Sequence, residues 1–359
     1  MPAVIRQARA PAPPAPTPYP PLGPAHAFPR APLVRVLERR WLHYAFASRD
    51  GELGMVANVA TLGPSPEDPL GAPRTTSILL VHRRGRGWCA SQFNAATLAP
   101  LWSAFRRPHP HGEPGRLEID GVAGTVGIHA DLLRTGRPCT SQCAPFGGGA
   151  HHLRWQSEPG VVARGTWRFR GEDHAGVDAV GYHERVRGYW GWPELGGWVF
   201  GFANDPEARG NAPPPAALVF TLIQPRDARG SATGSVMLWR HGRLVRHFPR
   251  RRVSVAVRGE LDRDQVVQVP ALANVLGVPP MPAIPRRLVI AARMGADQVL
   301  LDFACDAAAR VVIPSETSLR PFSVHEAIGP VRVEGVVSGA RFGFETHGIV
   351  EFAGGAGGH

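Results

Sequence analysis

Short apolar runs separated by Gly, Pro and Asp dominate the hydrophobic pattern of this 359-residue chain. Many runs are rich in the β-branched and aromatic residues that favour strands, whereas long stretches with helical periodicity are scarce. The pattern predicts strands within 41–48, 52–62, 75–83, 160–170, 198–205, 216–225, 234–248, 251–259, 286–295, 298–305, 331–339 and 342–354. One short helix is expected at 95–106, where Leu98, Leu101, Trp102 and Phe105 would share a face.

Many short strands with few helices are typical of β-sandwiches and up-and-down barrels, and the chain length favours two such units. His241-Gly242 predicts a tight hairpin turn within 234–248, because both residues tolerate positive φ. We place the boundary near Pro193, which gives domains at 33–193 and 194–354. The Pro/Ala-rich residues 1–32 are expected to be a disordered lead-in, and 355–359 a flexible tail.

The formal net charge is +11, and all 40 basic residues are Arg. These arginines are scattered, and the densest run, 246–252, lacks the interleaved exposed aromatics of a strand-binding groove. Nucleic acid is therefore not an expected partner. No apolar run has the length of a membrane span, and residues 1–30 lack the apolar core of a signal peptide. A cytoplasmic location is expected, and peripheral membrane contact stays open.

Only two of the four cysteines, Cys139 and Cys143, are close in sequence. Their spacing does not match paired zinc ligands, so neither a metal site nor a disulfide is expected. A GxSxG elbow, a P-loop and a dinucleotide fingerprint are absent in the required context. Serine hydrolysis and nucleotide chemistry are therefore not predicted, and no cofactor is expected.

The segment GYHERVRGYWGW (181–192) combines large aromatics with a carboxylate. In a strand, Tyr182 and Glu184 would share one face, and His183 would point to the other. A carboxyl among aromatics inside a barrel loses its hydration, so its pKa rises and it can donate a proton. Aromatic faces tolerate the carbocation that forms when an alkene is protonated. Glu184 is the expected proton donor, or His183 if its face points inward.

Other residues are candidates for substrate binding. They are Tyr182, Arg187, Tyr189, Trp190, Trp192 and Trp198, together with Glu326 and Glu351 from the last two strand regions. A structural alternative stays open, in which Glu184 and Arg187 form an ion pair and the aromatics seal one end of a barrel.

Five segments, taken in order, resemble one known family. They are RRWLHYAFASRDGELG (39–54), EPGVVARGTWRFRG (158–171), GYHERVRG (181–188), WVFGFAND (198–205) and SVHEAIGPVRVEGVVSGARFGFETHGIVEFAG (323–354). This chain resembles the tandem lipocalin-like proteins that include carotenoid hydratase (hydroxyneurosporene synthase), bacterial proteins labelled secreted hydrolases, and fungal decalin-forming Diels–Alderases. This chain has Glu184 where the family signature has Asp, and Arg187 where the signature has Trp. His325-Glu326 replaces a Trp-Glu pair.

The resemblance implies an all-β protein of two lipocalin-like barrel units in tandem, with a cavity for a hydrophobic small molecule. It also implies a cofactor-independent hydratase or cyclase that acts on an isoprenoid or polyketide-like substrate. Two other functions stay open: a lipid or pigment carrier without chemistry, and a β-sandwich interaction module without an enclosed cavity. The sequence does not predict the oligomeric state.

Overall fold

The computed structural model describes most of the chain between residues 38 and 355. The described ranges are 38–63, 74–95, 105–106, 115–121, 124–146, 151–190, 195–207, 210, 212–225, 233–269, 283–313 and 322–355. The predicted lead-in at 1–32 and residues 356–359 of the predicted tail lie outside these ranges.

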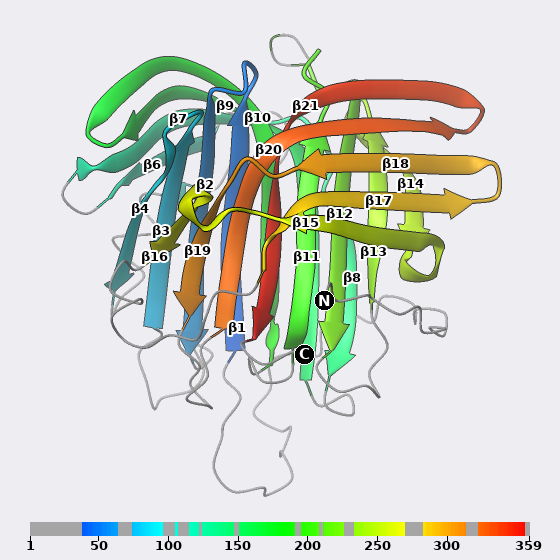
Figure 1. The fold of residues 1–359 in the computed structure, drawn as a ribbon, viewed down its shortest axis with the longest axis horizontal. Helices are drawn as coiled ribbons and strands as arrows, with labels where there is room; N and C mark the ends of the chain where they lie inside the picture. Colours follow the sequence, from blue (N-terminus) through cyan, green and yellow to red (C-terminus); the bar gives the residue numbers. More distant parts are fainter. Residues whose placement is uncertain are drawn as a thin grey trace, which may run out of the picture.

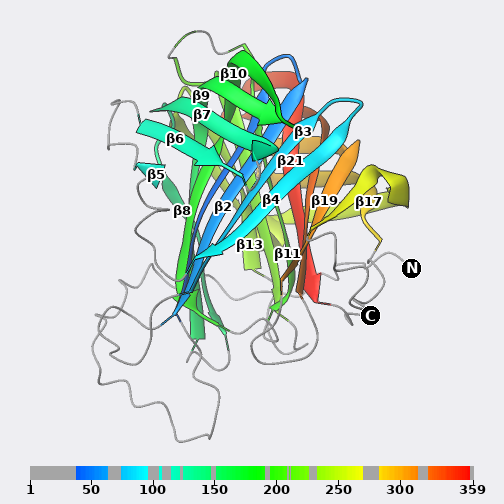
Figure 2. The same cartoon turned by 90° about the vertical axis from the view of Figure 1, so that its left-hand side faces the viewer.

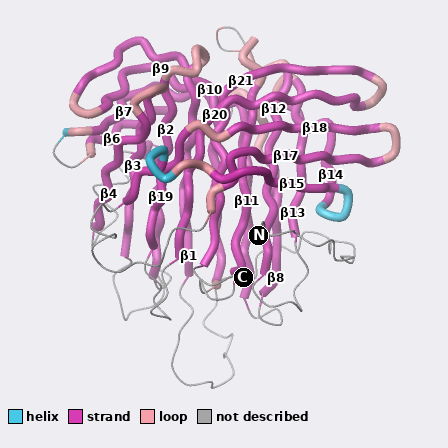
Figure 3. The backbone as a smooth tube through the Cα atoms, in the orientation of Figure 1, coloured by secondary structure: helices cyan, strands magenta, loops and turns pink. Residues whose placement is uncertain are grey.

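Two large sheets, almost entirely antiparallel, make up the structure (Figure 1). The first contains β1 (Glu38–Ser48), β2 (Leu53–Gly63), β3 (Arg74–Arg83), β4 (Gly87–Ala95), β5 (Phe105–Arg106), β6 (Gly115–Asp120), β7 (Val126–Arg134), β8 (Cys139–Phe146), β9 (His151–Phe169) and β10 (Glu172–Tyr189). The second contains β11 (Leu195–Asn204), β12 (Ala216–Pro225), β13 (Thr233–Arg240), β14 (Arg243–Pro249), β15 (Val253–Glu260), β16 (Val266–Val269), β17 (Pro285–Met294), β18 (Asp297–Ala304), β19 (Ala307–Ile313), β20 (Phe322–Val337) and β21 (Ala340–Gly355). Helix occurs in short turns such as η4 (Arg250–Arg252) and η5 (Arg263–Gln265) (Figure 3).

Both sheets follow the same plan. The first runs β4-β3-β2-β1-β10-β9-β7-β6-β5, and the second runs β14-β13-β12-β11-β21-β20-β18-β17-β15. In each, the first strand of the unit pairs with the last, and the two final strands form a long hairpin. The predicted class, two lipocalin-like all-β units, is confirmed. The chain passes from the first sheet to the second between β10 and β11. The predicted domain boundary at Pro193 lies outside the described ranges and stays a prediction.

The first strands of both units contribute to the apolar cluster in which the units pack against each other. On β1, Tyr44 and Phe46 belong to the core of the first unit, whereas Trp41 and Ala45 belong to a cluster shared with the second. Because successive side chains of a strand point to opposite faces, this strand is buried on both sides. β11 contributes Trp198, Phe200 and Phe202 to the shared cluster. Figure 2 shows β9 and β10 toward one side of the molecule and β19 and β21 toward the other.

Most predicted strands are confirmed, and so is the hairpin turn, since φ is 46° at His241 and 73° at Gly242. Both ends of the predicted helix are wrong, because Ala95 is the last residue of β4 and Phe105–Arg106 form a strand that pairs with Arg116–Leu117. Residues 96–104 of that helix lie outside the described ranges. Within the described residues, no helix has the length and apolar character needed to cross a membrane.

The side chain of Asn204 links the two units at a β-bulge beside the segment GYHERVRG (181–188). Gly160, at φ +71°, is the extra residue of β9 opposite Gly181 and Tyr182. Asn204 of β11 accepts a hydrogen bond from Gly160 N–H at 3.2 Å and donates one to the Gly181 carbonyl at 3.1 Å. Both hydrogen bonds are buried, so one amide from the second sheet satisfies two backbone groups at the bulge in the first.

Asn204→Leu should lower the free energy of unfolding by about 2–4 kcal/mol, because it leaves two buried backbone groups without partners. Equilibrium urea denaturation measures this. The control is Gln298→Leu, since Gln298 is exposed and its amide oxygen accepts a hydrogen bond from Arg293 at the surface; its effect should stay within about 0.5 kcal/mol. Equal stability of both variants would refute a bridging role for Asn204.

Candidate functional site

The carboxyl of Glu184 lies buried where the two sheets meet, with 3% of the residue exposed. Trp41 Nε1 donates to its Oε1 at 2.8 Å, and Trp155 Nε1 donates to its Oε2 at 2.5 Å. Strand register explains the convergence, because both Trp residues lie opposite Val186, two positions from Glu184 on the same face of the sheet. Three neighbouring strands, β1, β9 and β10, therefore build one polar site inside an aromatic cluster.

Burial is the largest influence on this carboxyl and raises the pKa of Glu184 well above its ordinary value. The nearby charge of Glu351 raises it further, whereas hydrogen bonds from Trp41, Tyr182 and Trp155 act in the opposite direction. The net effect favours the undissociated acid. Burial also raises the pKa of Tyr182, so its phenol stays protonated.

Tyr182 connects Glu184 to Ser157. The phenol oxygen lies 2.9 Å from Glu184 Oε2 and 2.8 Å from Ser157 Oγ, and its single proton can serve only one of them at a time. When Glu184 is undissociated, it can donate to the phenol oxygen while Tyr182 donates to Ser157. When Glu184 is ionised, Tyr182 can donate to the carboxylate. The same geometry therefore supports both states of the acid.

Aromatic rings surround this carboxyl on several sides. Trp41 meets Trp155 and Trp190 edge to face, at centroid distances of 5.8 and 5.4 Å. It also stacks on Trp198 of the second unit at 6.1 Å. Tyr182 packs against Phe200 of the second unit at 4.7 Å. Aromatic faces carry negative potential, so a positive charge that develops among these rings would be stabilised.

Two more carboxyls face this region from the second unit. Glu326 of β20 and Glu351 of β21 are directly opposite in register, and both are buried. Trp198 Nε1 donates a hydrogen bond to Glu351. Burial raises the pKa of both residues, and the charge of Glu351 raises that of Glu326 further. Because two adjacent buried carboxylates repel, the pair retains a proton when no cation is present.

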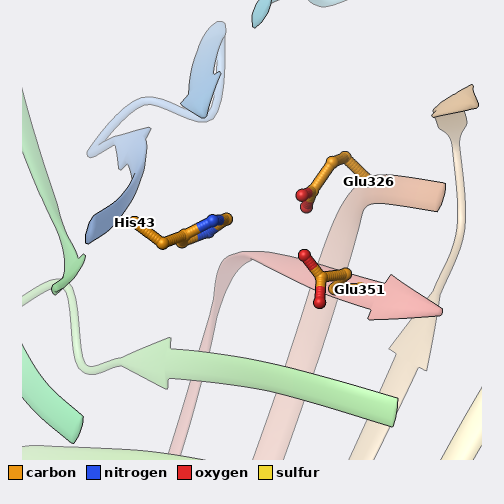
Figure 4. Close-up of side chains that lie close together, drawn as sticks. All are labelled: His43, Glu326 and Glu351. Carbon is orange, nitrogen blue, oxygen red and sulfur yellow. The ribbon is translucent and has the colours of Figure 1, made fainter. Parts of the chain in front are cut away.

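His43 of β1 points from the first unit toward this pair, as Figure 4 shows. One ligand atom from each of His43, Glu326 and Glu351 lies within 4.8 Å of the other two. Burial lowers the pKa of His43 to about 3, so the ring is neutral at physiological pH. Its Nδ1 lies 3.3 Å from the side-chain amide of Asn58.

The contact between Trp and Glu occurs once in each unit. Trp41 of β1 donates to Glu184 of β10, and Trp198 of β11 donates to Glu351 of β21. Since β1 and β10 hold the same places in the first sheet as β11 and β21 in the second, the two contacts are equivalent. An approximate internal twofold therefore relates the two acids.

The structure brings most of the predicted site residues together. Tyr182, Glu184, Trp190, Trp198, Glu326 and Glu351 all lie buried at or beside the junction of the units. His183 lies on the opposite face of β10, where its ring stacks on Tyr44 at 4.1 Å and its Nδ1 lies 3.0 Å from the His43 carbonyl. Trp192 lies outside the described residues.

Arg187 and Tyr189 lie toward the end of β10, away from the buried acid. Arg187 forms an ion pair with Glu38. The expected alternative of a pair between Arg187 and Glu184 is wrong, because indole and phenol groups surround the Glu184 carboxyl instead. Tyr189 is half-buried, with its ring 5.6 Å from that of His152.

Five residues of the site were not predicted: Trp41, His43, Trp155, Ser157 and Phe200. A signal for some of them is present in the sequence. Each unit begins with Trp, one spacer and an aromatic residue, as Trp41-Leu42-His43 and Trp198-Val199-Phe200. Trp155 and Ser157 have no such signal, because only strand pairing brings them beside Glu184.

Solved structures share this fold. A Nitrosomonas europaea protein assigned as AttH aligns at a TM-score of 0.57 with 14% identity, over 89% of this chain and 92% of that one. Kievitone hydratase from Nectria haematococca aligns at 0.53 with 11% identity, over 88% of each chain. CghA aligns at 0.49 with 11% identity, over 89% of this chain and 88% of that one. The first two alignments confirm the resemblance to tandem lipocalin-like proteins at the level of the fold.

No family model matches the sequence, and no curated protein matches it in sequence.

The stability of Glu184→Gln relative to that of the wild type should increase as pH rises. A carboxyl with a raised pKa in the folded state loses its proton more easily when the chain unfolds, so wild-type stability falls above the unfolded pKa of about 4.3. The neutral amide removes this dependence, and the difference should grow by up to about 1.4 kcal/mol per pH unit. Urea denaturation of both proteins between about pH 5 and pH 7, in metal-free buffer, measures it.

Glu172→Gln is the control, because Glu172 is on the same strand and exposed. It should show no such trend. If the wild type instead gains stability relative to Glu184→Gln as pH rises, Glu184 is ionised in the folded protein.

Proposed function

We propose that this protein is an enzyme that protonates a carbon–carbon double bond of a hydrophobic substrate of isoprenoid or polyketide type. The product would be a hydrated or a cyclised compound. The observation that supports this most strongly is the buried Glu184 carboxyl, held by Trp41, Trp155 and Tyr182 among aromatic rings. The shared fold with kievitone hydratase supports the same class of reaction.

Glu184 is the proposed proton donor. Its proton adds to one alkene carbon, the π electrons form the new C–H bond, and the other carbon becomes cationic. In hydration, water adds to this carbon and its surplus proton returns to the carboxylate. In cyclisation, a second double bond of the substrate adds instead, and a proton lost from carbon returns to the carboxylate. The acid is regenerated in both cases, so the proton transfer needs no cofactor.

The aromatic cluster would stabilise the cation and keep bulk water away from it. Trp41, Trp190 and Trp198 present indole rings around the acid, and cation–π attraction reaches about 2 kcal/mol or more where water is excluded. Tyr182 would position Glu184, because it contacts the oxygen that Trp155 also contacts. Arg187, Tyr189 and Trp192 remain proposed substrate contacts nearer the end of β10.

Heavy water provides the test, because both reactions place one deuterium on carbon. Wild-type protein would be incubated with a panel of acyclic prenylated alkenes, and products would be analysed by mass spectrometry. We expect a product with one carbon-bound deuterium. Glu184→Gln should lower kcat by about 10²–10⁴-fold, the usual contribution of a general acid, while substrate still binds.

Glu172→Gln again serves as the control and should retain wild-type turnover, since this carboxylate is exposed. Binding of an alkene by the wild type without any product would indicate a carrier. Full turnover by Glu184→Gln would exclude Glu184 as the donor.

A further inference from the structure

Two buried polar atoms of the cluster of His43, Glu326 and Glu351 have no hydrogen-bond partner among the described residues. They are Nε2 of His43, in the first unit, and Oε2 of Glu326, in the second. Both residues are almost fully buried, at 0% and 4% exposure. A buried polar atom without a partner costs about 1–3 kcal/mol, so two such atoms in side chains of one buried cluster indicate a ligand at that cluster.

The donor set is suited to a metal cation. One imidazole nitrogen and two carboxylate oxygens lie within 4.8 Å of one another, from His43, Glu326 and Glu351 (Figure 4). Zinc binds such nitrogen and oxygen atoms at about 2.0–2.2 Å, so ligand atoms on one ion lie up to about 4 Å apart. Small side-chain movements would bring these three atoms onto one ion. Two carboxylates would also balance a double positive charge in this buried region.

Asn58 is placed to orient the imidazole. Its side-chain nitrogen Nδ2 lies 3.3 Å from His43 Nδ1. When the amide is rotated so that its oxygen faces the ring, it accepts a hydrogen bond from Nδ1–H and leaves the lone pair of Nε2 available to a cation. Metal-binding histidines usually have such a partner for the other ring nitrogen.

The internal twofold provides a comparison within the same molecule. His43 and Phe200 stand two residues after the first Trp of each unit, and each lies opposite the buried acid in register. Ser157 and Glu326 flank those acids from the neighbouring strand. The place equivalent to the His43 cluster therefore holds Phe200, Glu184 and Ser157. Only one of the two places combines three metal-binding groups.

We infer that His43, Glu326 and Glu351 bind one divalent transition-metal cation, preferentially Zn²⁺, and so link the two β-units. Nitrogen together with carboxylate oxygens favours Zn²⁺ over Mg²⁺, which prefers oxygen ligands alone. The ion would join one residue of β1 to two residues of the β20–β21 hairpin.

Calorimetric titration of the chelator-treated, full-length protein with ZnCl₂ tests the inference without any substrate. We expect tight binding of one ion per chain at this site, no comparable binding of MgCl₂, and a higher Tm in the presence of zinc. His43→Phe and Glu326→Gln should each weaken zinc binding by more than about 100-fold. Loss of a group that only hydrogen-bonds a metal ligand already lowers metal affinity by about 10–100-fold.

Both substitutions are chosen to preserve the fold. Phe occupies the equivalent position in the second unit at Phe200, and Gln has the shape of an undissociated Glu. Circular dichroism of the metal-free variants would check this. His129→Ala is the control, because His129 and Asp120 form an exposed pair that could attract zinc without a built site, and it should retain tight binding. Absence of zinc binding, or binding unchanged in both site variants, would overturn the inference.

Discussion

Burial of the Glu184 carboxyl between two sheets is the constraint on which the rest of this structure depends. An isolated carboxylate is too costly to bury, so such a group either keeps its proton or requires donors. Here burial favours the proton, and Trp41, Trp155 and Tyr182 surround both oxygens. Large indole rings supply these contacts while they also fill the space between the sheets. The same indole rings therefore pack the two units together and hold the buried acid in place.

The repeated plan of the two sheets explains why acids gather at this junction. Each unit directs an indole N–H at a glutamate of its last strand, through Trp41 and Glu184 in the first and Trp198 and Glu351 in the second. Facing units bring the two acids close enough for the charge of one to affect the pKa of the other. The units then differ beside each acid, with hydroxyl groups near Glu184 and a second carboxyl beside Glu351.

The sequence predicts the strands well, because apolar runs and turn residues are local signals. It also places Tyr182 and Glu184 on one face, since strand periodicity alone determines this. The partners of Glu184 are harder to predict from the sequence, because Trp155 reaches Glu184 only through the register of β9 with β10. His43 meets the acids of the second unit only through packing between units. The incorrect ends of the predicted helix have a similar cause, because Ala95 pairs with Thr75 and Phe105 with Leu117 across strands.

Infrared spectroscopy tests the central claim most directly, because an undissociated carboxylic acid has a carbonyl stretching band that a carboxylate lacks. The measurement is the difference spectrum between wild type and Glu184→Gln near neutral pH, in chelator-treated buffer. We predict a carbonyl band of a buried, undissociated acid that disappears in the variant. A difference spectrum that contains only carboxylate bands would contradict the account, since Glu184 would then be ionised.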